Sequence, residues 1–120
     1  MIEIYKVTND LVTALKTVMT NVFPMLAPQG TSLPFIIYQH TGFNPEGSKD
    51  GEYEATTTFN ITIVTGDYSS GLQYVDAVRR AINGITSDYY TYEHTVLGAS
   101  EQAYDDGYSQ VLTISLSATK

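Results

Sequence analysis

The sequence lacks cysteine and tryptophan entirely, and only six of its 120 residues are lysine or arginine. Without cysteine the chain has no disulfide bond, no thiolate nucleophile and no zinc or iron–sulfur site built on thiolates. Its 13 aspartates and glutamates give a formal net charge of −7, which disfavours an overall basic face for binding phosphates. Six cations still allow a local basic patch, but we expect no specific nucleic-acid partner.

The sequence also lacks long apolar runs. None approaches the about 20 residues that a membrane-spanning helix requires. Residues 1–5, followed by Lys6, have no apolar centre of the kind found in a signal peptide. We therefore expect a soluble chain that is not exported and has no membrane partner. A chain of this length buries roughly two thirds of its unfolded surface in one core, so we expect a single domain over residues 1–120.

Residues 59–84 indicate a strand, a tight turn and a helix. The apolar positions are Phe59, Ile61 and Ile63 with a period of two, then Tyr74, Val75, Val78, Ala81, Ile82 and Ile85 with helical spacing. Two N-terminal caps compete: a capping box formed by Ser70 and Gln73, or Asp67 alone. Gly84 is placed to supply the left-handed residue that often closes a helix.

The remaining elements follow from the same periodicities. A first helix is predicted from Thr8 or Asn9 up to Pro24, and residues 1–7 are compatible with a short strand or an early helical turn. Strands are predicted over residues 35–41, 53–65, 89–99 and 111–118. The order α-β-β-α-β-β predicts an α+β fold, with a mainly antiparallel four-stranded sheet and two helices packed on one face. The other face would be rich in Thr and Tyr, and either solvated or in contact with another subunit.

Three places provide candidate contact residues for assembly. Residues 43–52 predict a loop longer than an ordinary hairpin connection, which would be either a solvated tip or one that meets a neighbour. The strand over residues 89–99 has no purely apolar side, which is typical of an edge strand or a contact surface. An Asp-Gly pair predicts a tight turn before the last strand. The candidates are Phe43, Glu46, Lys49, Asp50, Glu52 and Glu54 at the loop, Tyr90 and Tyr92 on the strand, and Tyr104, Asp105 and Asp106 at the turn.

No pattern of catalytic or metal-binding residues is apparent. His40 and His94 each fall inside a predicted strand, without a pair of carboxylates at ligand spacing. Glu101, Asp105 and Asp106 do not have the spacing of a helix-loop-helix calcium site. We expect no cofactor, no metal and no enzymatic activity.

The order and spacing of several segments resemble the tail-completion, or tail-terminator, proteins of long-tailed bacteriophages and prophages. The segments are residues 28–30 leading to 33–38, residues 61–68 followed by Leu72 and residues 75–82, and the acidic turn before Gly107, Tyr108 and the closing strand. They cover most of the chain. The resemblance implies a structural protein without a catalytic centre.

The same resemblance implies a homo-oligomeric ring, commonly a hexamer, at the head-proximal end of the tail tube. Such a ring stops tube polymerisation and joins the tail to the head. The implied partners are other copies of the chain, the tail-tube protein and a head-completion protein. The implied location is the virion tail, assembled in the cytoplasm of the bacterial host.

A different class of function is compatible with the same residues. A Tyr-rich sheet face also suits an α+β module that binds a small molecule or a peptide, because tyrosine combines apolar area with a hydroxyl group. The sequence leaves both hypotheses open.

Overall fold

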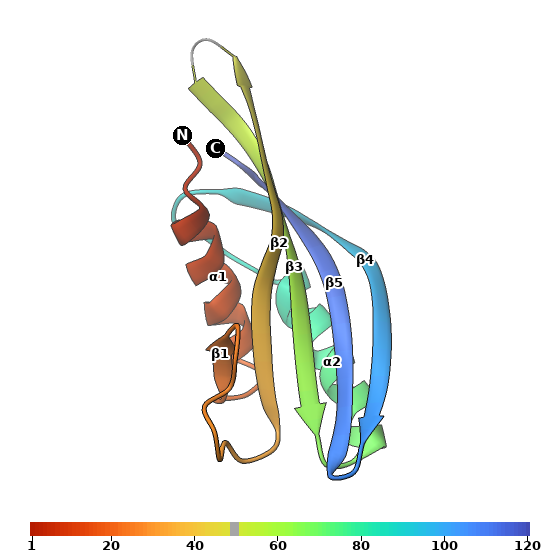
Figure 1. Cartoon of the computed structure of the whole chain (residues 1–120). Helices are drawn as coiled ribbons and strands as arrows, with labels where there is room; N and C mark the ends of the chain where they lie inside the picture. The colour runs from red at the N-terminus through yellow and green to blue at the C-terminus, as the bar shows by residue number, and fades with distance from the viewer. Residues whose placement is uncertain (49–50) are drawn as a thin grey trace.

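A computed structural model describes residues 1–48 and 51–120 of the chain. The described residues form two helices and one five-stranded sheet with the strand order β1-β2-β3-β5-β4 (Figure 1). The elements are α1 (Ile4–Lys16), β1 (Val22–Pro24), β2 (Phe35–Ser48), β3 (Gly51–Thr65), α2 (Tyr68–Asn83), β4 (Thr91–Tyr104) and β5 (Gly107–Thr119). The α+β class and the two helices agree with the expectation from the sequence.

The predicted four-stranded antiparallel sheet is wrong in one respect, because the sheet has a fifth strand and is mixed. Strand β1 pairs in parallel with β2, with Val22 opposite Ile36. The apolar spacing had placed Val22 on the first helix, but α1 starts at Ile4 and ends at Lys16. The residues after Lys16 are rich in β-branched types, which are stiff in a helix and favoured in strands. Pro24 is accommodated because β1 is an edge strand.

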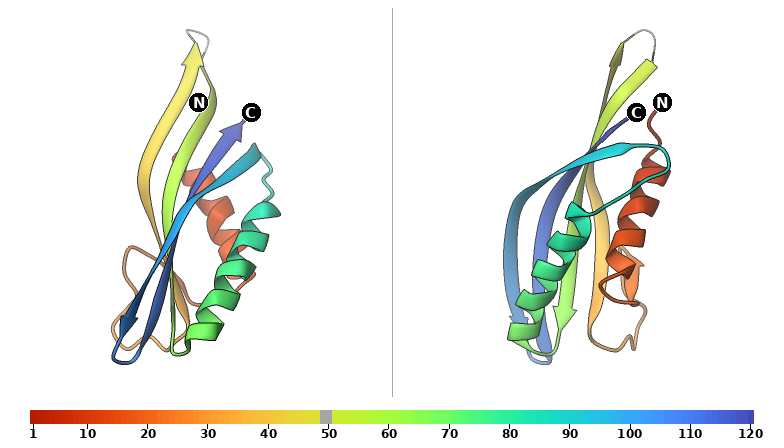
Figure 2. Two further views of the ribbon diagram at one scale, coloured as in Figure 1. Left: turned by 90° about the vertical axis from the view of Figure 1, so that its right-hand side faces the viewer. Right: turned by 180° about the vertical axis from the view of Figure 1, so that it is seen from behind.

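The predicted loop over residues 43–52 is also wrong. Strand β2 continues to Ser48 and β3 begins at Gly51, and the two pair antiparallel along this whole stretch. Pro45 stands opposite Ala55 on a part of β2 that β1 does not reach, where a missing N–H is tolerated. Lys49 and Asp50 lie outside the described residues. We call residues 42–48 with 51–54 the arm; it projects past both helices (Figure 2).

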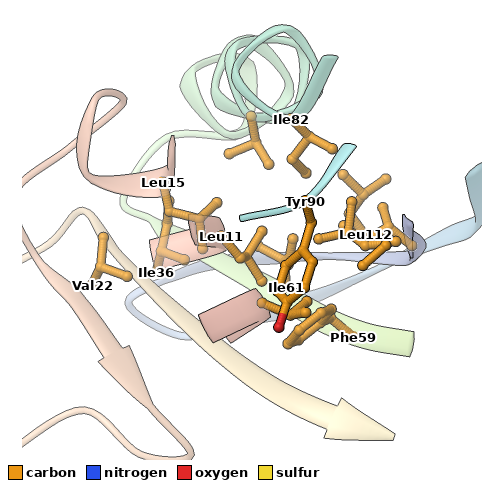
Figure 3. Close-up of a cluster of buried hydrophobic side chains, with 14 of the residues drawn as sticks. Leu11, Leu15, Val22, Ile36, Phe59, Ile61, Ile82, Tyr90 and Leu112 are labelled. Atoms are coloured by element: carbon orange, nitrogen blue, oxygen red, sulfur yellow. The ribbon is translucent and has the colours of Figure 1, made fainter. Parts of the chain in front are cut away.

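Both helices pack on the same face of the sheet. Phe59, Ile61 and Ile63 of β3 share this face with the alternate residues of β5 from Leu112 to Ala118, as the alternation predicted. The helices contribute Val7, Leu11 and Leu15 from α1, and Val78 and Ile82 from α2. Figure 3 shows how Leu11 and Leu15 meet Ile36 and Ile61, while Ile82 approaches from the other helix.

The N-terminus of α2 is capped by Asp67 rather than by a capping box. One carboxylate oxygen of Asp67, Oδ2, accepts hydrogen bonds from the backbone N–H of Ser70 at 2.8 Å and from its hydroxyl at 2.9 Å. These bonds lower the pKa of the Asp67 carboxyl. The expectation for Gly84 is wrong: its φ is −99°, so the helix ends without a left-handed residue.

Replacing Val78 by aspartate should abolish cooperative folding. Val78 has no exposed surface, and an unpaired charge buried among aliphatic side chains costs several kcal/mol, about as much as a small domain's total stability. Thermal melting followed by circular dichroism measures the effect. The control is Gln73→Asp on the exposed side of the same helix, which should melt close to wild type. Two similar melting curves would show that the packed face of α2 is misassigned.

The cap should make stability depend on pH through Asp67. Its pKa is lower in the folded chain than in the unfolded chain, so its ionised form stabilises the fold above the unfolded pKa of about 4. That stabilisation is lost as the pH falls through the folded pKa. The variant Asp67→Asn keeps an oxygen acceptor but cannot titrate. The melting temperature of wild type minus that of this variant should therefore decrease as the pH is lowered from about 7 to about 2. A difference that stays constant over this range would contradict the prediction.

Candidate assembly surfaces

The face of the sheet away from the helices carries mostly uncharged hydrogen-bonding side chains. Its central residues are Thr56, Thr58, Asn60 and Thr62 on β3, and Thr113, Ser115 and Ser117 on β5. Their side chains bond across the strands: Thr56 Oγ1 lies 2.9 Å from Ser117 Oγ, and the Thr113 hydroxyl donates to Asn60 at 2.8 Å. We call this the open face. These bonds order part of its surface before any partner arrives.

The open face is rich in threonine, as expected from the sequence, but not in tyrosine. At the paired positions of β2, β3, β5 and β4, the described residues place only Tyr104 on it, at the end beside the β4–β5 turn. Tyr38, Tyr92 and Tyr108 occupy positions on the helix side instead, because they stand in register with Ile61, Ala118 and Thr65. The paired positions of the described strands therefore do not give the open face the tyrosine lining that a small-molecule or peptide-binding module would use.

The arm gathers acidic residues at one end of the molecule. Glu46 and Glu54 stand directly opposite each other on its two strands. Glu52 is held by the N-terminus, since its Oε1 accepts the backbone N–H of Ile2 at 3.0 Å. Phe43 is partly exposed on the other side of the arm, in register with Thr57.

Tyr90 and Tyr92 have structural contacts instead of free surfaces. Only 9% of Tyr90 is exposed, and its hydroxyl accepts the backbone N–H of Glu3 at 3.0 Å. Figure 3 shows the Tyr90 ring above Phe59 and Ile61. The Tyr92 hydroxyl donates to Asp10 Oδ2, and burial together with this bond raises the pKa of the Tyr92 phenol. Both side chains connect the start of β4 to the N-terminal region.

The predicted turn joins β4 to β5 as a two-residue connection of Asp105 and Asp106, with Tyr104 paired to Gly107. The side chains of Tyr104, Asp105 and Asp106 are exposed. A Cβ atom at Gly107 would lie 2.5 Å from the carbonyl oxygen of Thr65, so only glycine fits there. The turn and the arm lie at opposite ends of the sheet (Figure 1). The candidate residues therefore form two separate surfaces.

A groove between α2 and β4 was not foreseen from the sequence. The helices cover β3 and β5 but not β4, whose residues are exposed along almost its whole length. Three adjoining hollows of about 310, 360 and 230 Å³ follow the space between helix and strand. We call this the α2–β4 groove; it is lined by Leu72, Val75, Arg79 and Arg80 of α2 with Val96 and Ala99 of β4. One indication of it was present in the sequence, the predicted strand over residues 89–99 that has no purely apolar side. That strand corresponds to β4, which lies at the edge of the sheet as predicted.

Near the β4–β5 turn the groove is closed by a polar contact. The Tyr68 hydroxyl lies 3.1 and 3.0 Å from the two carboxylate oxygens of Glu101, and this bond raises the pKa of the Tyr68 phenol. The rings of Tyr68 and Tyr108 also meet edge to face, with 5.5 Å between their centroids. The contact fixes the start of α2 against β4.

The histidines are placed apart. His40 Nε2 is 2.7 Å from the Thr8 hydroxyl and its ring lies 4.8 Å from that of Phe59, whereas His94 lines the α2–β4 groove. Within residues 1–48 and 51–120, no three His, Asp or Glu side chains are grouped so that they could hold a metal ion. In the same part of the chain, no helix has the length and apolar character needed to cross a membrane.

Comparison with protein-family models and with curated protein sequences finds no match to this chain.

The role of Tyr92 can be separated from that of an interface residue. Tyr92→Phe removes the hydrogen bond to Asp10 and should lower the free energy of unfolding by about 1 kcal/mol. It should leave self-association unchanged. Tyr104→Phe is the matched control, because it removes a hydroxyl from an exposed position at the turn and should not affect stability. Urea unfolding measures the first property and sedimentation velocity the second. A Tyr92→Phe chain that is stable but associates less would place Tyr92 in the interface.

Proposed function

We propose that this chain is a tail-completion, or tail-terminator, protein of a long-tailed phage or prophage. It forms a ring at the head-proximal end of the tail tube, stops tube growth and joins the tail to the head. Its partners are other copies of itself, the tail-tube protein and a head-completion protein. It acts as a structural protein of the virion tail and is assembled in the bacterial host.

The observation that carries this proposal is the open face. A wide sheet surface of threonine, serine and asparagine side chains stays uncovered while the helices occupy the opposite side. At its centre it offers hydrogen-bonding groups to a partner without the charged side chains that would resist desolvation. Oligomer interfaces tolerate such polar surface when its hydrogen bonds are satisfied across the contact. A ring of these sheets presents either a contact surface or a channel wall whose centre is uncharged.

The charge distribution supports the second alternative, in which the open face lines a channel for DNA. DNA must slide past a terminator ring when it leaves the head through the tail, and a wall that attracted phosphates would slow its passage. The chain has a net charge of −7, and Thr, Ser and Asn dominate the centre of the open face. Arg79 and Arg80 belong to α2 on the other side of the sheet. A channel lined by the open face would therefore not bind the DNA backbone.

The proposal predicts that the chain controls tube length. The purified chain, added to polymerising tail-tube protein from the same genome, should give shorter tubes with a defined cap at one end in electron micrographs. A variant in which Asn-Gly replaces residues 46–54 keeps Pro45 and Ala55 as the last pair of the shortened hairpin. It should fold, because the removed pairs lie outside the core. It should cap tubes less well.

The matched control is Tyr5→Phe, which removes one hydroxyl group from an exposed position on α1, outside the candidate surfaces, and should cap as wild type does. If wild type leaves tube length and tube ends unaltered, the proposal is wrong. If the shortened arm caps fully, the arm has no part in termination.

A further inference from the structure

The α2–β4 groove contains a buried donor that has no acceptor. Gln110 of β5 is 5% exposed and lies at the floor of the two hollows next to Leu72 and Tyr68. Its Nε2 atom has no hydrogen-bond partner within residues 1–48 and 51–120. Gly71 lets α2 approach the amide closely, since a Cβ there would be 3.3 Å from Gln110 Cγ. A buried donor without an acceptor is destabilising, so an acceptor entering the groove would be stabilising.

The groove also leaves apolar surface without cover. Leu72 is 43% exposed on α2 and Val96 is 41% exposed on the facing strand. Val75 and Ala99 lie between them. A segment placed along β4 would bury these side chains and would complete the helix-side layer over a strand that the helices leave exposed along almost its whole length.

The other end of the groove is basic. Arg79 and Arg80 line it together with His94 and Asn83. Arg79 contacts Asp76 at 3.6 Å, whereas Arg80 has no ion-pair partner within the described residues. These two arginines are a third of the six cations of a chain with net charge −7. An occupant of the groove should therefore carry carboxylates at this end.

The arm has the complementary chemistry. Glu46 and Glu54 face each other across it, and like charges at directly opposed positions repel. Within residues 1–48 and 51–120, neither forms an ion pair. In the same part of the chain, the outer edge of β2 beyond Tyr38 has no neighbouring strand, so it presents free backbone carbonyls, and Pro45 adds a carbonyl without an N–H. The arm thus offers both the carboxylates and the acceptors that the groove lacks.

The spacings also agree. Seven residues of helix separate Leu72 from Arg79, which is about 10 Å. Three residues of strand separate Phe43 from Glu46, again about 10 Å. With Glu46 at the arginines, Phe43 would reach the apolar middle of the groove.

The two sides of the arm match the two walls of the groove. Glu46 and Phe43 are an odd number of residues apart on one strand, so they point to opposite sides of the arm. An arm that enters with the free edge of β2 leading would turn one of these sides toward α2 and the other toward β4. Its edge carbonyls would then face the floor, where Gln110 lies. The arm projects from one end of the molecule and away from its own α2 and β4, so an arm that enters this groove belongs to a second copy (Figure 2).

We propose that the arm of one copy binds in the α2–β4 groove of the next, with Glu46 and Glu54 at Arg79 and Arg80. The contact joins two different surfaces, so it is heterologous and repeats from copy to copy until a ring closes. This inference rests on the proposed ring function and names the contact between its subunits. A backbone carbonyl of the arm accepts the hydrogen bond from Gln110.

Charge reversal tests the contact. The groove variant is Arg79→Glu with Arg80→Glu, and the arm variant is Glu46→Lys with Glu54→Lys. Each should weaken self-association at least about tenfold in sedimentation equilibrium, because opposed charges become like charges. An equimolar mixture of the two variants, or one chain with all four changes, should regain it. Lys16→Glu reverses a charge on the exposed side of α1, outside both the groove and the arm, and should associate as wild type does.

Engineered cysteines give a second readout that does not depend on how charge reversal affects folding. Because the chain has no cysteine, Glu46→Cys mixed with Asn83→Cys can form only the intended mixed disulfide or the two homodimers. We expect the mixed disulfide to dominate. Glu46→Cys mixed with Lys16→Cys should give no enrichment of the mixed product.

The outcomes separate this contact from the ring itself. Oligomers that persist unchanged in both charge variants, without an enriched disulfide between positions 46 and 83, would overturn the arm–groove contact and leave a ring built through another surface. A wild-type chain that stays monomeric at every concentration, with and without tail tubes, would overturn both.

Discussion

The fold depends on one apolar layer that β3 and β5 share with both helices. Alternate residues such as Phe59, Ile61 and Ile114 point to one side of the sheet and are fully buried, and each contributes about 1.5–3 kcal/mol. Because α1 and α2 both bury their apolar stripes on this side, no helix of the described chain remains to cover the opposite face. The same packing leaves β4 outside the helix layer and lets β2 and β3 extend beyond it as the arm. The surfaces available to partners therefore follow from how the core is filled.

Strong periodicity was sufficient to predict the central elements. The alternation in β3 and β5 and the stripe on α2 that includes Val78 and Ile82 occur as expected, because burial on one side leaves no other register. The short strand β1 was missed because Val22 fitted a helical spacing, while the parallel pairing that stabilises it comes from residues far along the chain. The arm was missed because proline and glycine, which it contains, are typical of loops. Pro45 is tolerated in a strand here because this part of β2 is a free edge of the sheet. Which tyrosines are buried depends on contacts such as Tyr92 with Asp10, 82 residues apart.

The candidate surfaces were predicted less well than the fold, and for a physical reason. Exposed residues have no periodicity of their own, so their grouping is known only once the elements are placed. Arg79 and Arg80 became candidates only because β4 lies uncovered beside them. Gln110 became one because it lies at the floor of that groove and its buried Nε2 atom has no acceptor in the described part of the chain. The acidic arm, the basic end of the groove and the uncharged centre of the open face are three distinct surfaces on a small acidic chain. Their separation is what a subunit needs if it is to contact a neighbour on each side and keep a third face for another partner.

Native mass spectrometry tests the ring most directly. The 13.2 kDa chain should give one discrete oligomer, either alone at high concentration or on tail-tube ends. The mass of this oligomer should be a fixed multiple of the subunit mass and should not grow further with concentration. A monomer under every condition, tubes included, or an open series of ever larger oligomers would contradict a closed terminator ring.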